Sequence, residues 1–233
     1  MKKNIDRMII LMFLCIIVYN LGHPATPALI ELRGWKKSIS GELLAFMSMA
    51  MFISSPYLGA LADRVGMKRI FVFMPFCYGM SQLIFGFGTN LPLIFLARMI
   101  SGFASGGTFA VAFGYVSQLS EKEEKAKNIA KAIGQKIGGY AATAMNDPQF
   151  SFALQFVGGS IVSIIILLIM KEIVQKDNNF GKEKNKKDLN PFATFRYIKE
   201  LDGYSKFFCL IILLSGIGIY SYGSALNYFL KFY

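Results

Sequence analysis

Three residues with ionisable side chains lie inside long apolar stretches of the sequence: Arg98, Lys136 and His23. A charged side chain among apolar residues is costly to bury, so we expect Arg98 to face a cavity or a polar partner. Lys136 brings a second positive charge, which suits a substrate or counter-ion site. His23, the only histidine, could exchange a proton near neutral pH, although a hydrogen-bonded histidine at a helix end is the plainer interpretation.

A short segment at 59–69 combines glycines, an acid and basic residues between two apolar runs. Gly59 would let two helices approach closely, and Gly66 would permit a sharp turn. Asp63 falls at an expected helix end, where its carboxylate can accept hydrogen bonds from a neighbouring helix N-terminus or pair with an arginine. An ordinary turn explains the basic residues Lys68 and Arg69, but it does not explain the glycines and Asp63 in this register.

Enzyme and metal chemistry are not indicated by the remaining residues. The sequence offers no paired carboxylates, histidine cluster, nucleophile–base pair or phosphate-binding loop, so we predict that the protein is not an enzyme. Cys15, Cys77 and Cys209 each lie in an apolar run without metal-like spacing. We therefore expect small buried or lipid-facing side chains, with neither a disulfide nor a metal site.

The composition indicates a membrane protein. Hydrophobic residues make up 54% of the 233 residues and charged residues only 17%, with a mean hydropathy of +0.46. A net charge of +11 would suit a nucleic acid partner. However, the basic residues lie in short loops between apolar runs rather than on one helix face, so the lipid bilayer is the predicted partner.

Apolar runs long enough to cross a bilayer as helices occur about seven times along the chain. They cover residues 8–29, 40–62, 70–88, 91–118, 127–145, 149–170 and 207–230. The first run reaches beyond the length of a signal peptide and is followed by more spans, so we expect a retained helix. Pro24 and Pro27 should kink or loosen its last turns.

Basic residues set the expected orientation and the division into domains. Most of them fall on the side of the membrane that holds the N-terminus, which predicts that this terminus is cytoplasmic. We expect a six-helix bundle at 1–170, a basic cytoplasmic loop at 171–206 and a seventh helix within 207–233. The predicted fold class is therefore an all-α polytopic membrane protein.

The segment at 59–69 resembles the signature loop of the major facilitator superfamily, G-x-L-a-D-r-x-G-r-k. The resemblance is carried by Gly59, Leu61, Asp63, Arg64, Gly66 and Lys68. Met67 stands where the family usually has a basic residue, and Arg69 takes the place of that residue. In that family the loop locks the inner gate through charge contacts. The resemblance therefore implies that Asp63 and Arg64 are gate residues.

Two more segments resemble motifs of the same family. Residues 96–102 resemble the R-x-x-q-G pattern of the fourth helix, which implies that Arg98 acts in substrate binding or proton transfer and that Gly102 serves helix packing. A snorkelling or structural arginine is the alternative. Residues 134–139 align with the antiporter motif G-P-x-x-G-G through Gly134, Gly138 and Gly139. Gln135 replaces the proline of this motif, and Lys136 adds a charge. These two departures leave open whether the protein is an antiporter and whether it transports at all.

The resemblance implies a secondary transporter of the drug-efflux type that works by alternating access, with no bound cofactor and with coupling to a proton gradient. Members have two six-helix halves, with the substrate site between them. This chain supplies one half, the central loop and one further helix. We therefore expect a truncated copy of such a transporter. By itself, it should not transport its small, hydrophobic substrate. The alternative is a non-transporting fragment, or a half-transporter that needs a complementary C-terminal half.

Overall fold

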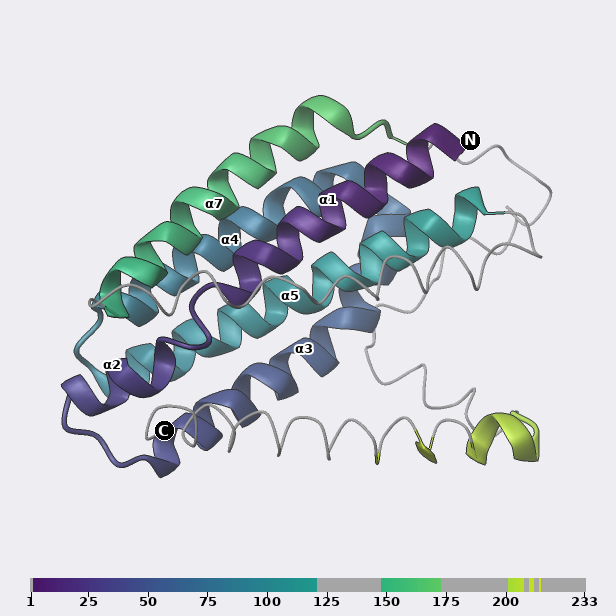
Figure 1. The fold of residues 1–233 in the computed structure, drawn as a ribbon. Coiled ribbons are helices and arrows are strands. Elements are labelled where there is room, and N and C mark those ends of the chain that lie inside the picture. The colour runs from purple at the N-terminus through teal and green to yellow at the C-terminus, as the bar shows by residue number, and fades with distance from the viewer. Residues whose placement is uncertain (1, 121–147, 173–200, 208–209, 212–213, 215–233) are drawn as a thin grey trace.

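The computed structural model of the chain describes residues 2–120, 148–172, 201–207, 210–211 and 214. Its long helices lie side by side in one bundle (Figure 1). In chain order the elements are α1 (Lys2–Asn20), α2 (Thr26–Leu32), α3 (Ser38–Val65), α4 (Met67–Phe87), α5 (Leu91–Leu119) and α7 (Pro148–Ile169). The spans predicted at 40–62, 70–88, 91–118 and 149–170 therefore match α3, α4, α5 and α7 to within one helical turn.

Two predicted helices fall mainly outside this part of the chain. The helix expected at 127–145 lies outside the described residues, and so does most of the helix expected at 207–230. Of the latter, residues 207, 210–211 and 214 are described, and they are helical. Most of the basic loop predicted at 171–206 also lies outside the described residues.

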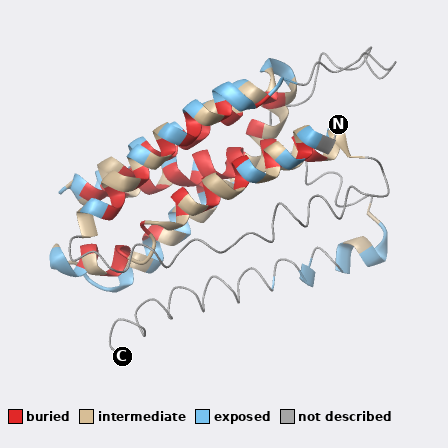
Figure 2. Ribbon diagram, turned by 45° about the horizontal axis from the view of Figure 1, so that its top comes forward, coloured by how far each residue is buried: buried red, intermediate tan, exposed pale blue. Residues whose placement is uncertain are grey.

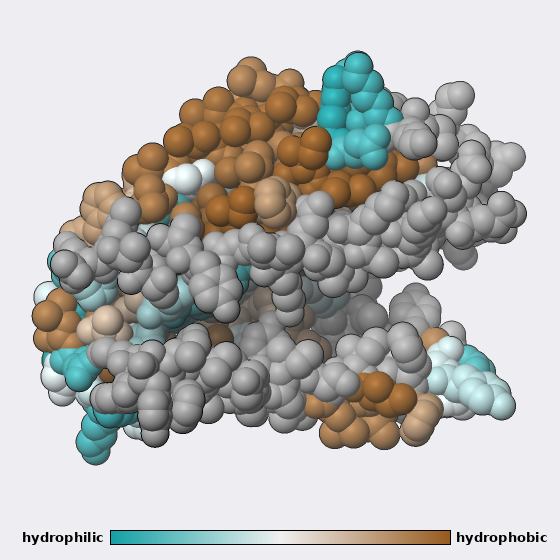
Figure 3. Space-filling model, viewed as in Figure 1, coloured by the Kyte–Doolittle hydropathy of each residue, from teal (hydrophilic) through white to brown (hydrophobic). Residues whose placement is uncertain are grey.

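Four of the helices (α3, α4, α5 and α7) are long and apolar enough to cross a membrane. The 21 residues of α4 extend for about 31 Å, close to the thickness of the hydrocarbon core. Figure 3 shows a broad hydrophobic surface over α7. The exposed apolar side chains of this helix include Val157, Ile161, Ile164, Leu167 and Leu168. Such a surface suits lipid and would be unfavourable in water.

The first predicted span is interrupted, which corrects the expectation of one kinked helix at 8–29. The helix α1 ends at Asn20, and the chain turns through residues 21–25 before α2 begins at Thr26. Pro24 has no N–H to donate to a helix, and Pro27 lies in the first turn of α2, where a missing donor costs nothing. Together the two prolines favour a stop and a new start over a bend.

Glycines set how closely the helices pack. A Cβ added at Gly102 of α5 would collide with the backbone carbonyl of Met47 in α3. In the pair α4 and α7, a Cβ at Gly79 would lie 2.9 Å from the Cα of Phe156, and one at Gly159 would lie 2.5 Å from the carbonyl oxygen of Pro75. Backbones in contact at these points gain close van der Waals packing, which drives helix association where lipid replaces water.

Buried residues lie on the helix faces that point into the bundle (Figure 2). A larger apolar cluster joins α1, α3, α4, α5 and α7, and a smaller one lies at the end of the bundle that holds α2. The helix α5 packs against α1, α3 and α4 and is the most buried of the four spans, whereas α3 is the least buried. Side chains on α5 are therefore well placed for contacts inside the bundle.

Candidate functional site

Arg98 is buried inside the bundle, where α2, α4 and α5 meet. Only 4% of the residue is exposed. Its Nη2 donates a hydrogen bond of 2.8 Å to Oγ1 of Thr26, at the start of α2. Its guanidinium carbon lies 3.6 Å from the centre of the Phe85 ring, near the end of α4. Arg98, which we expected to need a polar partner, thus contacts a hydroxyl group and the face of an aromatic ring.

The surroundings of Arg98 supply little negative charge. Among the described residues, no carboxylate lies within ion-pair distance of its guanidinium. His23, in the turn between α1 and α2, lies within electrostatic range of Arg98, as does Tyr78 of α4. The structure therefore brings together two of the three residues singled out from the sequence, Arg98 and His23. The third, Lys136, lies outside the described residues.

The last turn of α1 is held by side chains from α4 and α7. Gln155 donates from Nε2 to the carbonyl oxygens of Val18, at 2.8 Å, and Tyr19, at 3.1 Å. The Tyr78 hydroxyl donates to the Tyr19 carbonyl oxygen at 2.8 Å. These bonds satisfy carbonyls that the end of α1 leaves without a helical partner. The signal of these bonds in the sequence is the presence of Gln155 and Tyr78 within apolar runs.

Tyr19 adds a second layer to this polar network. Its ring stacks on Tyr78, with centroids 4.0 Å apart, and its hydroxyl shares a hydrogen bond of 2.6 Å with Oγ1 of Thr108 in α5. Both residues are buried. The interruption of the first span is therefore tied to three other helices by polar side chains.

Arg33 closes the end of the bundle beside α2. Its Nη2 donates to the carbonyl oxygens of Phe85, at 3.1 Å, and Gly86, at 2.7 Å, which lie in the last turn of α4. Its guanidinium also lies 5.0 Å from the centre of the Trp35 ring. A cation at a helix C-terminus is electrostatically favourable. Partial burial lowers the pKa of Arg33 from its ordinary value, because desolvation disfavours the charged form.

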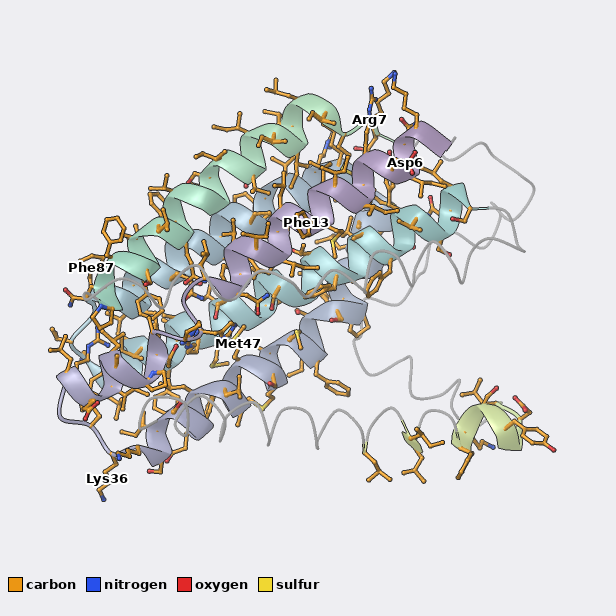
Figure 4. The ribbon with its side chains drawn as sticks, viewed as in Figure 1. Asp6, Arg7, Phe13, Lys36, Met47 and Phe87 are labelled. Carbon is orange, nitrogen blue, oxygen red and sulfur yellow. The ribbon has the colours of Figure 1, made fainter. Side chains whose placement is uncertain are left out.

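The opposite end of the bundle holds the predicted gate loop. Figure 4 shows Asp6 and Arg7 at this end, and Lys36 and Phe87 at the other. The whole turn between α3 and α4 is Gly66, whose φ of 105° lies in the region that favours glycine.

The other residues of the gate loop differ in their surroundings. Asp63 is half-buried, and its Oδ1 accepts a hydrogen bond of 3.4 Å from Nε2 of Gln118 in α5. Arg64 and Arg69 are exposed, and Lys68 is half-buried. Two apolar positions complete the loop: Leu61 packs against the larger core cluster, and a Cβ on Gly59 would make only an ordinary contact with Ala110.

Glu172, which the sequence did not single out, lies at the N-terminus of α4. Its Oε1 accepts a hydrogen bond of 3.3 Å from the backbone N–H of Lys68. A Cβ on Gly66 would lie 3.0–3.2 Å from the Glu172 carboxylate. The preceding residue, Lys171, accepts a hydrogen bond of 3.0 Å through its carbonyl from the hydroxyl of Tyr115. The segment that leaves α7 is thus fixed to both the gate loop and α5.

The remaining predicted positions fall partly within and partly outside the described residues. Gly102 lies at the crossing of α5 and α3, whereas Gly134, Gly138 and Gly139 fall outside the described residues. Cys15 and Cys77 are free thiols, and Cys209 is outside the described residues. Within the described part of the chain, no group of three His, Cys, Asp or Glu residues could hold a metal ion.

A comparison with known families decides the classification. The sequence profile of the Major Facilitator Superfamily matches residues 8–233. The chain belongs to the Major Facilitator Superfamily. This superfamily consists of membrane transporters rather than enzymes, and the match confirms the predicted fold class, an all-α polytopic membrane protein of the major facilitator type.

Among superfamily members, drug-resistance proteins of bacteria are similar to this chain. It is 26% identical to the quinolone resistance protein NorA of Staphylococcus aureus over 193 residues, which cover 79% of this chain and 49% of NorA. It is 24% identical to multidrug resistance protein 2 of Bacillus subtilis over 221 residues, which cover 86% of this chain and 52% of that protein. The chain thus spans about half the length of these curated relatives.

A solved structure of the superfamily shares the fold. The crystal structure of the human organic anion transporter MFSD10 (TETRAN) matches with a TM-score of 0.59 at 14% sequence identity, over 72% of this chain and 48% of that one. At this identity the similarity concerns the fold alone. The chain is a multi-pass membrane protein of a transporter family.

Proposed function

We propose that this chain forms one half of a drug-efflux transporter that moves a small hydrophobic molecule across the plasma membrane. The observation that carries the proposal is Arg98, a cation buried among membrane-spanning helices beside His23. Intramembrane charges are expensive and usually mark a substrate or ion pathway. The similarity to NorA and to multidrug resistance protein 2 supports efflux of drug-like molecules.

Transport would proceed by alternating access between two halves that rock about a central site. Because the chain spans about half the length of its relatives, the opposite wall of the pathway would come from a second six-helix half. At the inner end, Asp63 and Arg64 would act as gate residues, and the exposed Arg64 is free of the bundle core. The basic inner segments favour a cytoplasmic N-terminus.

Proton coupling is the expected driving force, with quinolones as a first class of cargo to test because of the similarity to NorA. Inside-out membrane vesicles containing the 233-residue chain would be loaded with a proton gradient, and uptake of a fluorescent quinolone would be followed. We expect no gradient-driven uptake by the chain alone. Uptake should appear when a complementary C-terminal half is co-expressed, and a protonophore should abolish it.

Strong uptake by the chain alone would overturn the need for a second half. Absence of uptake with every complementary half would instead favour a non-transporting membrane protein. That alternative is supported by Gln135 and Lys136, which depart from the antiporter motif of the family. Cysteine labelling from one side of sealed vesicles would test the orientation, with a cysteine at Lys3 expected to react only from the cytoplasmic side.

A further inference from the structure

The apolar helices of this chain hold positive charge with little negative charge to balance it. The predicted spans contain Arg98 and, within the span at 127–145, Lys127, Lys131 and Lys136. The carboxylate within them is Glu42, which is exposed near the start of α3. Nothing in these spans therefore offers a buried acid to neutralise a buried base, and a counter-charge from outside the protein becomes the natural complement.

Among the described residues, Arg98 is a buried positive charge for which no acidic partner is found. Its described contacts are all with neutral groups: the Thr26 hydroxyl, the Phe85 ring and its electrostatic neighbours His23 and Tyr78. A guanidinium has five N–H donors in a planar fork, and it binds carboxylates and other anions well in this geometry. The Thr26 hydroxyl and the Phe85 ring occupy part of this hydrogen-bonding capacity, but neither group neutralises the positive charge of Arg98.

Gln82 provides a second, independent sign of a missing ligand. Only 1% of this residue is exposed, yet neither its Nε2 nor its Oε1 has a hydrogen-bond partner. It lies on the same face of α4 as Tyr78 and Phe85, one turn from each, and both of those residues interact with Arg98. An unpartnered buried amide is rare and calls for a bound water or ion.

We propose that Arg98 and Gln82 bind one small monovalent anion, a halide or a carboxylate group, between α2, α4 and α5. The guanidinium supplies the charge and the Gln82 Nε2–H₂ a neutral donor, while the Phe85 ring and Thr26 limit the space. A cation is disfavoured because Arg98 already carries positive charge. Water alone would satisfy the amide of Gln82 and leave the charge uncompensated.

The test is the thermal stability of the purified chain in detergent, followed through the fluorescence of its single tryptophan, Trp35, which packs against the same apolar cluster as Phe85. Sodium chloride and sodium acetate would be compared at equal ionic strength with sodium gluconate, whose anion is much larger. We expect chloride or acetate to raise the unfolding midpoint saturably, by about 5 °C at a 100-fold excess over Kd. A response to chloride would identify an inorganic anion as the ligand, and a response to acetate would identify a carboxylate.

Two substitutions at Gln82 make the test specific. Gln82→Leu removes no hydrogen bond of the described structure and should abolish the dependence on the anion. Gln82→Glu introduces a carboxylate on the face of α4 that carries Tyr78 and Phe85, and it should give a midpoint that no longer responds to chloride or acetate. Lys36→Gln, at an exposed cation on the end of the bundle, is the control and should respond like the parent chain.

Equal midpoints in the three salts would overturn the proposal, and so would a full anion response in Gln82→Leu or in Gln82→Glu. Since the readout is binding to the chain itself, these outcomes are independent of whether the protein transports quinolones. A chain that transports without an anion response would refute the anion site and leave the proposed function intact.

Discussion

The carboxylate of Glu172, just beyond the end of α7, accepts a hydrogen bond of 3.3 Å from the backbone N–H of Lys68 in the first turn of α4. A negative charge at a helix N-terminus is favourable because the free N–H groups there carry partial positive charge. In this protein the contact also links the predicted gate loop to the segment that follows α7. It therefore gives this end of the bundle a defined geometry.

Loss of this contact should lower stability modestly. For Glu172→Ala we expect a loss of about 0.5–1 kcal/mol in the free energy of unfolding, since a partly exposed helix cap is removed. Thermal unfolding of the purified chain in detergent would measure the change. Lys171→Ala is the control, because the described contact of Lys171 uses its backbone carbonyl. An equal loss in both variants would contradict a specific role of Glu172.

Gly66→Ala should be more harmful than an average glycine substitution. With φ 105° and ψ 133°, the Gly66 backbone lies in a region that residues with a Cβ rarely adopt, so an alanine there costs about 1–3 kcal/mol, and its Cβ would also crowd the Glu172 carboxylate. Gly41→Ala, at a helical position with nothing within 4 Å of the added Cβ, should be neutral or stabilising. Combining Gly66→Ala with Glu172→Ala separates the two causes: the crowding should vanish, and the backbone strain should stay.

Close packing of α3 and α5 predicts that Gly102→Ala destabilises the bundle. The new methyl group would collide with the Met47 carbonyl, and we expect a cost of about 1–3 kcal/mol or a loss of folded protein during purification. Gly59→Ala is a matched control on the other helix, because its Cβ would lie at an ordinary 3.7 Å from Ala110. Size-exclusion profiles and thermal midpoints would compare the two, and equal behaviour would count against tight packing at Gly102.

The polar network at the end of α1 should control local opening. Gln155→Leu leaves the Val18 and Tyr19 carbonyls with fewer partners, so we expect a loss of about 1–3 kcal/mol and faster hydrogen exchange in peptides that cover residues 16–26. Tyr78→Phe keeps the ring that stacks on Tyr19 and loses one bond, so its effect should be smaller. Unchanged exchange in both variants would show that these bonds do not hold the turn.

The sequence predicted the positions of α3, α4, α5 and α7 well, because a bilayer requires long apolar runs and short connections leave little choice of boundary. It did not predict the full interruption after Asn20. Pro24 and Pro27 are compatible with either a kinked helix or a break, and the outcome depends on whether side chains from other helices reach the freed carbonyls.

Contacts between distant residues were also beyond prediction from the sequence. Arg98 was recognisable as a costly buried charge, yet its partner Thr26 lies 72 positions away and depends on how α2 folds back onto α5. Glu172 looked like an ordinary acid after an apolar run. Its role follows from the antiparallel packing of α4 and α7, which brings the start of one helix beside the end of the other.

The turn after α1 has a consequence for how the protein is made. The Tyr19 carbonyl accepts its hydrogen bonds from Tyr78 and Gln155, which the ribosome adds 59 and 136 residues later. Until these residues are synthesised and inserted, the interrupted segment carries a carbonyl that lipid cannot satisfy. The first span must therefore wait in a wet or protein-lined environment, such as the insertion channel, before the bundle can close around it.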